Sequence, residues 1–297
     1  MKTSRVRDAS PRWLVAEAPT AARKLRRGRE ADAANGRMAH AYIGCSGWRY
    51  ASWRGPFYPD TLAPSQWLSY YASQFGTVEI NNTFYRLPEQ STFAGWRAAT
   101  PDGFTIAVKA SGYLTHRKRL RAPAEPLARL FGRAAALGPR LGPILYQLPA
   151  TLRHDASLLR RFLTGLASQG ARLLESNRKA GQPRVPQLRH VIEFRDASWY
   201  RPDVFEAIQS AGAAVCLHDM PGSAIADGPH KPFVYVRFHG TEGKYSGNYS
   251  DGVLSGWARR LKRVLVEGHD VYAYFNNDLG GTAVQNARTL IRYVCGS

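Results

Sequence analysis

Hydrophobic and polar positions follow two distinct patterns along this chain. Short runs of apolar and β-branched residues are each followed by stretches in which apolar residues recur every three or four positions. The first pattern predicts β-strands and the second predicts amphipathic helices. The predicted strands cover residues 42–46, 77–83, 104–110, 144–148, 190–195, 214–218, 233–239 and 270–276.

The helices that lie between these strands are clearest in three stretches. Residues 64–75 begin with Pro64, which suits a first helical turn, and place apolar side chains on one face at helical spacing. Residues 254–266 and 283–293 show the same spacing. Residues 219–231 are rich in Gly and Pro, and we expect a loop there.

The alternation of strands and helices predicts the fold class. A crossover helix returns the chain to the same edge of a sheet, so the strands are expected to be parallel. Residues 41–297 hold eight such units of about 32 residues each, close to the size of a (β/α)₈ barrel. We therefore predict an α/β fold with a single TIM-type barrel over residues 41–297. An open doubly wound sheet, which needs only five or six strands, is the alternative.

Residues 1–40 differ from the rest of the chain. They contain ten basic and four acidic residues, are rich in Ala and Arg, and show no sustained apolar period. This composition predicts a disordered basic tail, with an Arg-rich transit peptide as the alternative. Met38 directly precedes the first patterned segment and is an alternative start of the protein.

Composition limits the classes of protein that need to be considered. No run of 18 apolar residues is present, so we expect no membrane segment. The three cysteines are far apart and favour neither a disulfide framework nor a zinc knuckle, which indicates a cytoplasmic protein. The formal net charge is +19, of which the first 40 residues carry +6 and the rest +13. This charge makes nucleic acid a candidate partner, although no nucleic-acid-binding motif is present.

Polar residues gather at the carboxyl ends of the predicted strands. Period-two alternation places Glu79 with Asn81, Glu193 with Arg195, and Arg237 with His239 on a shared face. These side chains are expected to point into the barrel or its mouth, where barrel enzymes carry their active sites. The alternative is structural, because buried charges can satisfy one another as ion pairs.

Several of these segments resemble a known family. The runs that carry the resemblance are GCSGWRYASWRGPFYP (44–59), FGTVEINNTFYRLP (75–88), FTIAVKASGYLTHRKRL (104–120), VIEFRDASWY (191–200), VYVRFHG (234–240) and YAYFNND (272–278). They are similar to the domain of unknown function 72 family, also called YecE-like. The resemblance covers residues 41–297 and implies a TIM-type barrel, but the family has no established activity. Its motifs match Gly47, Trp48, Glu79, Asn81, Tyr85, Lys109, His116, Glu193, Arg195, Trp199, Asp219, Arg237, His239, Asn276 and Asn277.

Three kinds of chemistry fit the residues at the strand ends. Glu79 and Glu193 are candidates for an acid/base pair. Lys109, Arg195 and Arg237 suit an anionic group, and the glycines at 280 and 281 suit a phosphate at the start of the last helix. A divalent metal at Glu193, Asp219, His239 and Asp278 is a weaker alternative, because neighbouring guanidinium groups repel a dication. No cofactor is predicted.

Two further groups of residues lie at the end of the first strand and directly after it. Trp48, Tyr50, Trp53, Phe57 and Tyr58 form an aromatic cluster, in which Trp48 is the best candidate to contact a ligand and the others favour core packing. Cys45 and Ser46 lack the sequence context of an activated nucleophile, so no covalent mechanism through them is expected.

These patterns predict an enzyme that acts on a small polar, anionic ligand by general acid/base chemistry at the barrel mouth, with a phosphorylated or sugar-like compound as the kind of ligand. We predict catalytic roles for Glu79, Lys109, Glu193 and His239. We predict ligand-binding roles for Trp48, Asn81, Tyr85, Arg195, Asp219, Arg237, Asn276 and Asn277. The alternatives are a nucleic-acid-binding or metal-dependent, endonuclease IV-like processing protein, and a barrel that binds a ligand without turnover.

Overall fold

The computed structural model describes residues 38–181, 184–220, 232–243 and 245–296. Eight parallel strands close into a barrel in the order in which they follow one another along the chain. The strands are β1 (Ala41–Ser46), β2 (Thr77–Ile80), β3 (Thr105–Lys109), β4 (Leu141–Gln147), β5 (His190–Glu193), β6 (Ala214–His218), β7 (Val234–Phe238) and β8 (Val271–Phe275). The predicted TIM-type barrel is confirmed.

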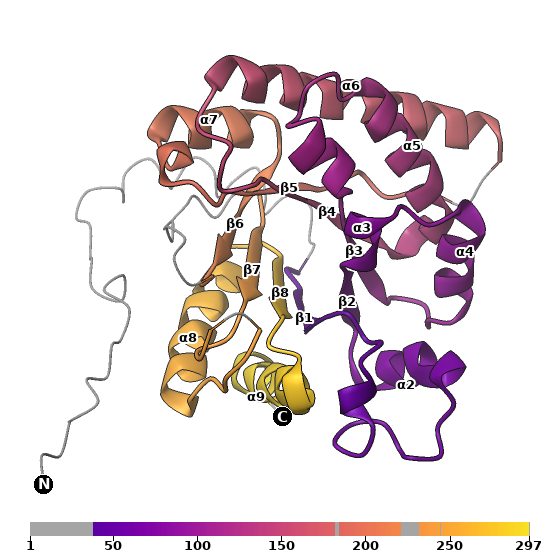
Figure 1. Ribbon diagram of the computed structural model, residues 1–297, viewed down its shortest axis with the longest axis vertical. Coiled ribbons are helices and arrows are strands. Elements are labelled where there is room, and N and C mark those ends of the chain that lie inside the picture. The colour runs from indigo at the N-terminus through magenta and orange to yellow at the C-terminus, as the bar shows by residue number, and fades with distance from the viewer. Residues whose placement is uncertain (1–37, 182–183, 221–231, 244, 297) are drawn as a thin grey trace, which may run out of the picture. The chain divides into compact units, whose positions relative to one another are not determined.

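Helices surround the strands in the part of the chain that is described (Figure 1). They are α2 (Trp67–Gln74), α3 (Asn82–Tyr85), α4 (Gln90–Ala98), α5 (Ala124–Ala134), α6 (Ala156–Lys179), α7 (Pro202–Ser210), α8 (Asp251–Val266) and α9 (Thr282–Cys295). The π-helical turn η5 (Tyr113–Arg117) follows β3. The three helices expected from helical spacing are all present. No helix within the described ranges is long and apolar enough to cross a membrane.

The ends of several elements differ from the sequence prediction. β2 stops at Ile80, because Asn81 turns the backbone to φ −100° and ψ −23° and α3 begins at the next residue. β4 begins at Leu141, three residues before the predicted start, although Gly142 and Pro143 read as a turn. A register shift between β3 and β4 accommodates them there. The predicted tail at residues 1–40 and the predicted loop at 219–231 lie mostly outside the described residues.

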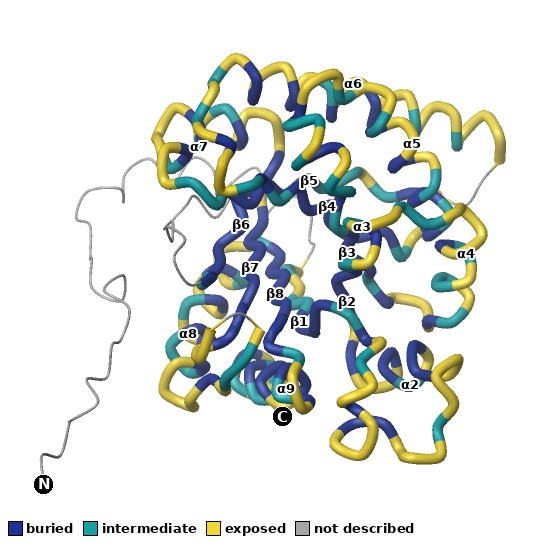
Figure 2. The backbone as a smooth tube through the Cα atoms, in the orientation of Figure 1, coloured by how far each residue is buried: buried dark blue, intermediate teal, exposed yellow. Residues whose placement is uncertain are grey.

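The strands are buried on both faces, while each surrounding helix exposes its outer side (Figure 2). In α6, Leu159, Phe162 and Leu166 face the barrel, and the Asp155 carboxylate caps the helix by accepting from the Leu158 N–H at 2.9 Å. The interior of the barrel is filled by Ala107, Leu145, Val191, Ala214, Cys216, Phe233, Tyr235, Tyr272 and Tyr274. This apolar layer supports a polar layer at the carboxyl ends of the strands, which we call the barrel mouth.

A close approach between β1 and β2 requires glycine at position 44. A Cβ on Gly44 would lie 2.4 Å from the Thr77 carbonyl oxygen and 2.9 Å from the Tyr71 hydroxyl. We expect Gly44→Ala to lower the free energy of unfolding by about 1–3 kcal/mol, because the backbone must shift to relieve the overlap. Gly76→Ala is the matched control, since a Cβ there meets no atom within 4 Å. Urea denaturation followed by circular dichroism measures both, and equal losses would contradict the packing argument.

Candidate functional site

A cluster of buried ion pairs occupies the barrel mouth. Arg237 on β7 donates to both carboxylate oxygens of Glu79 on β2, with Nε–Oε2 and Nη2–Oε1 distances of 3.0 and 2.9 Å. Its other terminal nitrogen lies 2.8 Å from Oε2 of Glu193 on β5. All three side chains are at most 1% exposed. One guanidinium group therefore joins two carboxylates from opposite sides of the barrel.

Neighbouring hydroxyl groups complete the environment of Glu79. Ser46 Oγ donates to Oε1 at 2.5 Å, and the Tyr235 hydroxyl donates to Oε2 at 2.6 Å. Burial alone would raise the pKa of Glu79, but the charge of Arg237 and these hydrogen bonds hold it below its usual value. Glu79 is therefore ionised at neutral pH and acts as a hydrogen-bond acceptor.

Glu193 is held in the same way by two cations. Arg195 Nε donates to its Oε1 at 2.5 Å, while Arg237 binds Oε2. Burial opposes ionisation, yet the charges of Arg237 and Arg195 keep the pKa of Glu193 well below its usual value. A carboxylate with this pKa is a poor proton donor, and both of its oxygens already have partners.

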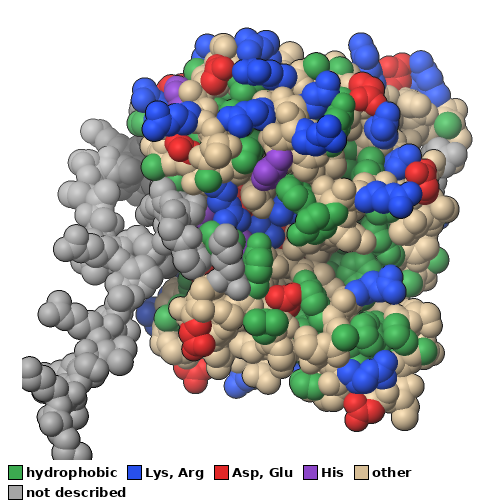
Figure 3. All heavy atoms as spheres, in the orientation of Figure 1, with side chains coloured by type: hydrophobic (Ala, Val, Ile, Leu, Met, Phe, Trp, Pro, Cys, Tyr) green, Lys and Arg blue, Asp and Glu red, His purple; other side chains and the backbone are tan. Residues whose placement is uncertain are grey.

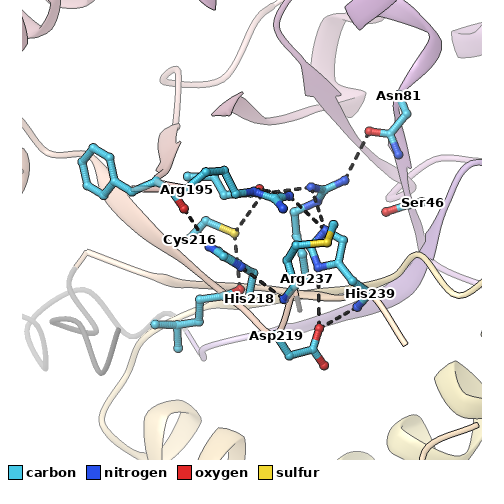
Figure 4. Close-up of polar contacts among 12 residues, drawn as sticks. Ser46, Asn81, Arg195, Cys216, His218, Asp219, Arg237 and His239 are labelled. Carbon is cyan, nitrogen blue, oxygen red and sulfur yellow. Dashed lines mark hydrogen bonds and ion pairs between the residues drawn. The ribbon is translucent and has the colours of Figure 1, made fainter. Parts of the chain in front are cut away.

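His239 lies against the two guanidinium groups (Figure 4). Its Nε2 is 3.3 Å from both Arg195 Nη2 and Arg237 Nη1, so this nitrogen accepts and the ring proton belongs on Nδ1, which is 3.6 Å from an Asp219 oxygen. Burial and the charge of Arg237 outweigh Asp219 and lower the pKa of His239 to about 4. The imidazole is neutral at pH 7 and supplies no positive charge to an anion.

Asp219 and His218 organise the backbone at the ends of β6 and β7. Asp219 accepts from the His239 N–H at 2.6 Å and from the Tyr249 hydroxyl. His218 Nε2 lies 2.7 Å from the Phe194 carbonyl oxygen, to which it donates. These contacts fix the loops around the mouth.

Above the ion pairs lies a cavity of about 400 Å³. Its lining residues are Gly47, Trp48, Arg49, Tyr50, Ile80, Asn81, Asn82, Tyr85, Lys109, Arg237, Tyr245, Asn276 and Asp278. The loops after β1, β2, β7 and β8 and the end of β3 supply these side chains. Aromatic rings, amides and cations thus surround one space, which is typical of a site for a small polar ligand.

Lys109 differs from the arginines of the mouth. It is half-buried, and its Nζ lies 4.4 Å from the centre of the Phe84 ring. Within the described ranges its ammonium group forms no hydrogen bond or ion pair. Burial and the charge of Arg237 lower the pKa of Lys109 to about 8, although Glu193 and Glu79 act in the opposite direction. Its ammonium group is therefore available to a ligand in the cavity.

The structure separates the predicted site residues into two groups. Those that line the cavity are Trp48, Asn81, Tyr85, Lys109, Arg237 and Asn276. Those that are not among its lining residues are Glu79, Glu193, Arg195, Asp219, His239 and Asn277. Asn277 instead donates to the Gly247 carbonyl and to Asn286, which joins the loop after β7 to α9. Glu79, Glu193 and His239 of the second group contact Arg237 of the first.

Several lining residues were not predicted. Arg49 and Tyr50 directly follow Trp48, so proximity in the sequence was a usable signal. Tyr245 reaches the cavity because its backbone adopts φ +65° and its N–H donates to the His239 carbonyl at 2.7 Å, which no pattern in the sequence indicated. Asp278, which the sequence suggested only as a metal ligand, also lines the cavity; it is half-buried, and burial raises the pKa of its carboxyl group.

The alternative roles weighed from the sequence can now be located. Among the described residues, no group of three or more His, Cys, Asp or Glu side chains is arranged to hold a metal ion. Of the four residues considered for that role, Glu193 and Asp219 have their oxygens engaged by protein donors. Cys45 is buried, and burial raises the pKa of its thiol, so it is not an activated nucleophile, while the Ser46 hydroxyl donates to Glu79.

Comparison with known proteins agrees with this architecture. A family model described as "Protein of unknown function DUF72" matches residues 42–296. The UPF0759 protein YunF of Bacillus subtilis is 24% identical over 284 residues, which cover 84% of this chain and 93% of that protein. The UPF0759 protein YecE of Escherichia coli K12 is 32% identical over 129 residues, which cover 43% of this chain and 45% of that protein.

Solved structures show the same barrel. A crystal structure of a DUF72 family protein from Thermotoga maritima superimposes with a TM-score of 0.66 at 27% identity, covering 85% of this chain and 98% of that one. A DUF72 family protein from Enterococcus faecalis gives a TM-score of 0.68 at 18% identity, covering 86% and 96% of the two chains. At 18% identity, the similarity to the Enterococcus faecalis protein shows a shared fold and nothing more.

Proposed function

We propose that this chain, which belongs to the DUF72 family of proteins of unknown function, binds a small anionic ligand in the cavity at its barrel mouth. The observation that carries this proposal is Lys109, a half-buried cation that lines the cavity and has no anionic partner among the described residues. Holding such a charge away from water is costly unless an anion compensates it. The ligand would supply that compensation.

The neighbouring groups suit the rest of such a ligand. Asn276 is 7% exposed, and its side-chain amide has no hydrogen bond within the described ranges. Among the described residues, the only hydrogen bond to the Asn81 side chain is a long one of 3.5 Å from Arg237. The Trp48 ring forms one wall, and Arg49 adds a second cation on the exposed side. A compact anion with polar substituents would satisfy the ammonium and both amides.

The cluster of Glu79, Arg237 and Glu193 supports this site from below. Its two carboxylates are ionised and paired, so we assign them to holding Arg237 rather than to proton transfer. Lys109 lines the cavity beside this cluster, and its positive charge favours a ligand of negative charge.

We expect Lys109→Met to weaken the binding of sulfate at pH 7 by at least about tenfold, which corresponds to about 1.4 kcal/mol. Methionine keeps an unbranched chain against Phe84 but removes the charge. Lys118→Met is the matched control, because Lys118 also lies over an aromatic ring, that of Tyr113, and is not among the cavity-lining residues. Isothermal titration calorimetry measures the affinities. Equal effects of the two substitutions would rule out Lys109 as the anion-binding cation.

The affinity for sulfate should also depend on pH. Since the pKa of Lys109 is about 8, the ammonium form predominates at pH 7 and declines as the pH rises through 8. Binding that needs the ammonium form should weaken by up to about tenfold per pH unit well above 8. Sulfate keeps its charge over this range, so the loss reports on the protein. Titrations at pH 7, 8, 9 and 10 test this, and an affinity that stays constant would contradict the assignment.

The rim of the mouth favours nucleic acid as a second candidate ligand. Tyr85 is 87% exposed beside the cavity, and Arg117 and Lys118 lie over the Tyr113 ring in η5. Lys and Arg side chains also gather over α5 and α6 on the face drawn in Figure 3. Exposed aromatic rings among cations are typical of sites for single-stranded nucleic acid. Oligonucleotide binding that survives Lys109→Met and falls steeply with salt would favour this candidate.

A further inference from the structure

The cavity places an amine, a carboxyl group and an amide around one space. Lys109, Asp278 and Asn276 reach it from the ends of β3 and β8. We propose that Lys109 forms an imine with the carbonyl carbon of a small α-oxo acid, so that the ligand is held covalently during its reaction. This inference rests on the proposed anion site and names the class of ligand that it would take.

The surroundings of Lys109 suit a nucleophilic amine. A lysine attacks a carbonyl carbon only through its unprotonated form, which an ordinary lysine, with a pKa of about 10.4, rarely adopts at pH 7. Burial and the nearby Arg237 favour loss of the proton and lower the pKa of Lys109 to about 8. At pH 7 this gives on the order of 100-fold more free amine than an ordinary lysine has. The contact of the ammonium group with Phe84 keeps the side chain at the cavity wall.

An α-oxo acid fits the charge of this site. Its carboxylate is bonded directly to the carbonyl carbon, so an anion drawn to the Lys109 nitrogen brings that carbon within reach of the same atom. After reaction the nitrogen is an iminium and remains positive beside the carboxylate. The electrostatic match that binds the free ligand is therefore preserved in the adduct.

The step balances with groups that the cavity holds. The amine lone pair forms the C–N bond, and the carbonyl π electrons move to oxygen, which takes up a proton to give a carbinolamine. The nitrogen then passes a proton to the carboxylate of the proton donor, which returns it to the carbinolamine hydroxyl. The hydroxyl leaves as water, and the nitrogen lone pair forms the C=N bond of the iminium. Asp278 is the candidate proton donor, since burial raises the pKa of its carboxyl group. The side-chain amide of Asn276 can hold the carbinolamine oxygen by a hydrogen bond until this oxygen leaves as water. Hydrolysis reverses every step, so no oxidant or reductant is consumed.

The test is reductive trapping on the full chain. Pyruvate is added at pH 7.5 with sodium cyanoborohydride, which donates hydride to an iminium carbon and fixes it as a secondary amine. Peptide mapping by mass spectrometry should find the reduced adduct on Lys109 at least about tenfold more often than on Lys118. Lactate, which lacks the carbonyl group, should give no adduct but should slow the labelling. In denaturing urea the preference for Lys109 should vanish.

The outcomes separate this inference from the proposed anion site. Sulfate binding that depends on Lys109, together with labelling of Lys109 no faster than of Lys118, would overturn the imine and leave the anion site standing. Selective labelling of Lys109 without sulfate binding would support the imine and contradict the anion site. Asp278→Asn gives a second measure, because it should slow labelling of Lys109 while sulfate binding persists. An unchanged labelling rate in that variant would remove Asp278 from the mechanism.

Discussion

Replacing Arg237 with methionine should lower the free energy of unfolding by about 3–5 kcal/mol, since it leaves the buried carboxylates of Glu79 and Glu193 without their shared cation. Methionine keeps the unbranched stem of arginine and is apolar, so it removes the charge while part of the packing remains. Urea denaturation at pH 7, followed by circular dichroism, measures the change.

Removing the carboxylates at the same time should restore part of this stability. We expect the triple substitution Arg237→Met, Glu79→Gln and Glu193→Gln to unfold at a higher urea concentration than Arg237→Met alone, because no uncompensated negative charge remains. This comparison stays informative even if the single variant does not fold. A triple variant less stable than the single one would show that the stability of the barrel mouth depends on the shape of these side chains and not on their charge.

The ionised carboxylates also determine the direction in which stability changes with pH. The pKa values of Glu79 and Glu193 are lowered in the folded protein, so their contribution to stability is present above about pH 4.3 and is lost as the pH falls through the folded values. In the Arg237→Met variant the buried carboxylates should take up protons at a higher pH than in the protein that keeps Arg237. Protonation removes the unfavourable free energy of their buried charge. The difference in stability between the two proteins should therefore narrow as the pH falls from 7 to 4.

The fold could be predicted because its signals are local. Each strand, from β1 to β8, carries its own apolar run, and the order of elements limits the topology to a few choices. The prediction was wrong at the ends of elements. β4, for example, begins at Leu141, where pairing with β3 outweighs the tendency of Gly142 and Pro143 to form a turn. Period-two alternation also predicted a shared side for Glu79 and Asn81, and Arg237 contacts both although β2 ends at Ile80.

The roles within the mouth could not be predicted, since they depend on which side chains meet. Nothing in the sequence indicates that Arg237 rather than Lys109 pairs with both glutamates, and that choice leaves Lys109 facing the cavity. His239 illustrates the same difficulty. Its position at a strand end predicted a catalytic role, but burial and the neighbouring guanidinium charge of Arg237 lower the pKa of its ring to about 4 and keep it neutral.

The aromatic cluster after β1 contains one residue on which both the stability of the barrel and the shape of the cavity depend. Trp53 is fully buried, its ring packs against Phe57 and Tyr58, and its Nε1 donates to the Asp278 carbonyl at 2.7 Å. It thereby ties the loop after β1 to the end of β8, where the Asp278 side chain lines the cavity. Trp48, by contrast, lies at the cavity wall against Trp96.

We expect Trp53→Ala to lower the free energy of unfolding by about 3–5 kcal/mol, because it removes a large buried ring and leaves a cavity. Trp53→Phe is the matched control. It keeps most of the packing and removes the indole N–H, so its cost should be smaller, since the Asp278 carbonyl still accepts from the Gly281 N–H at 3.4 Å. Sulfate affinity measured on the same proteins distinguishes a residue that stabilises the barrel by packing from one that contacts the ligand. Trp48→Ala should weaken sulfate binding with a smaller loss of stability than Trp53→Ala, and the reverse order would assign the cavity wall to Trp53.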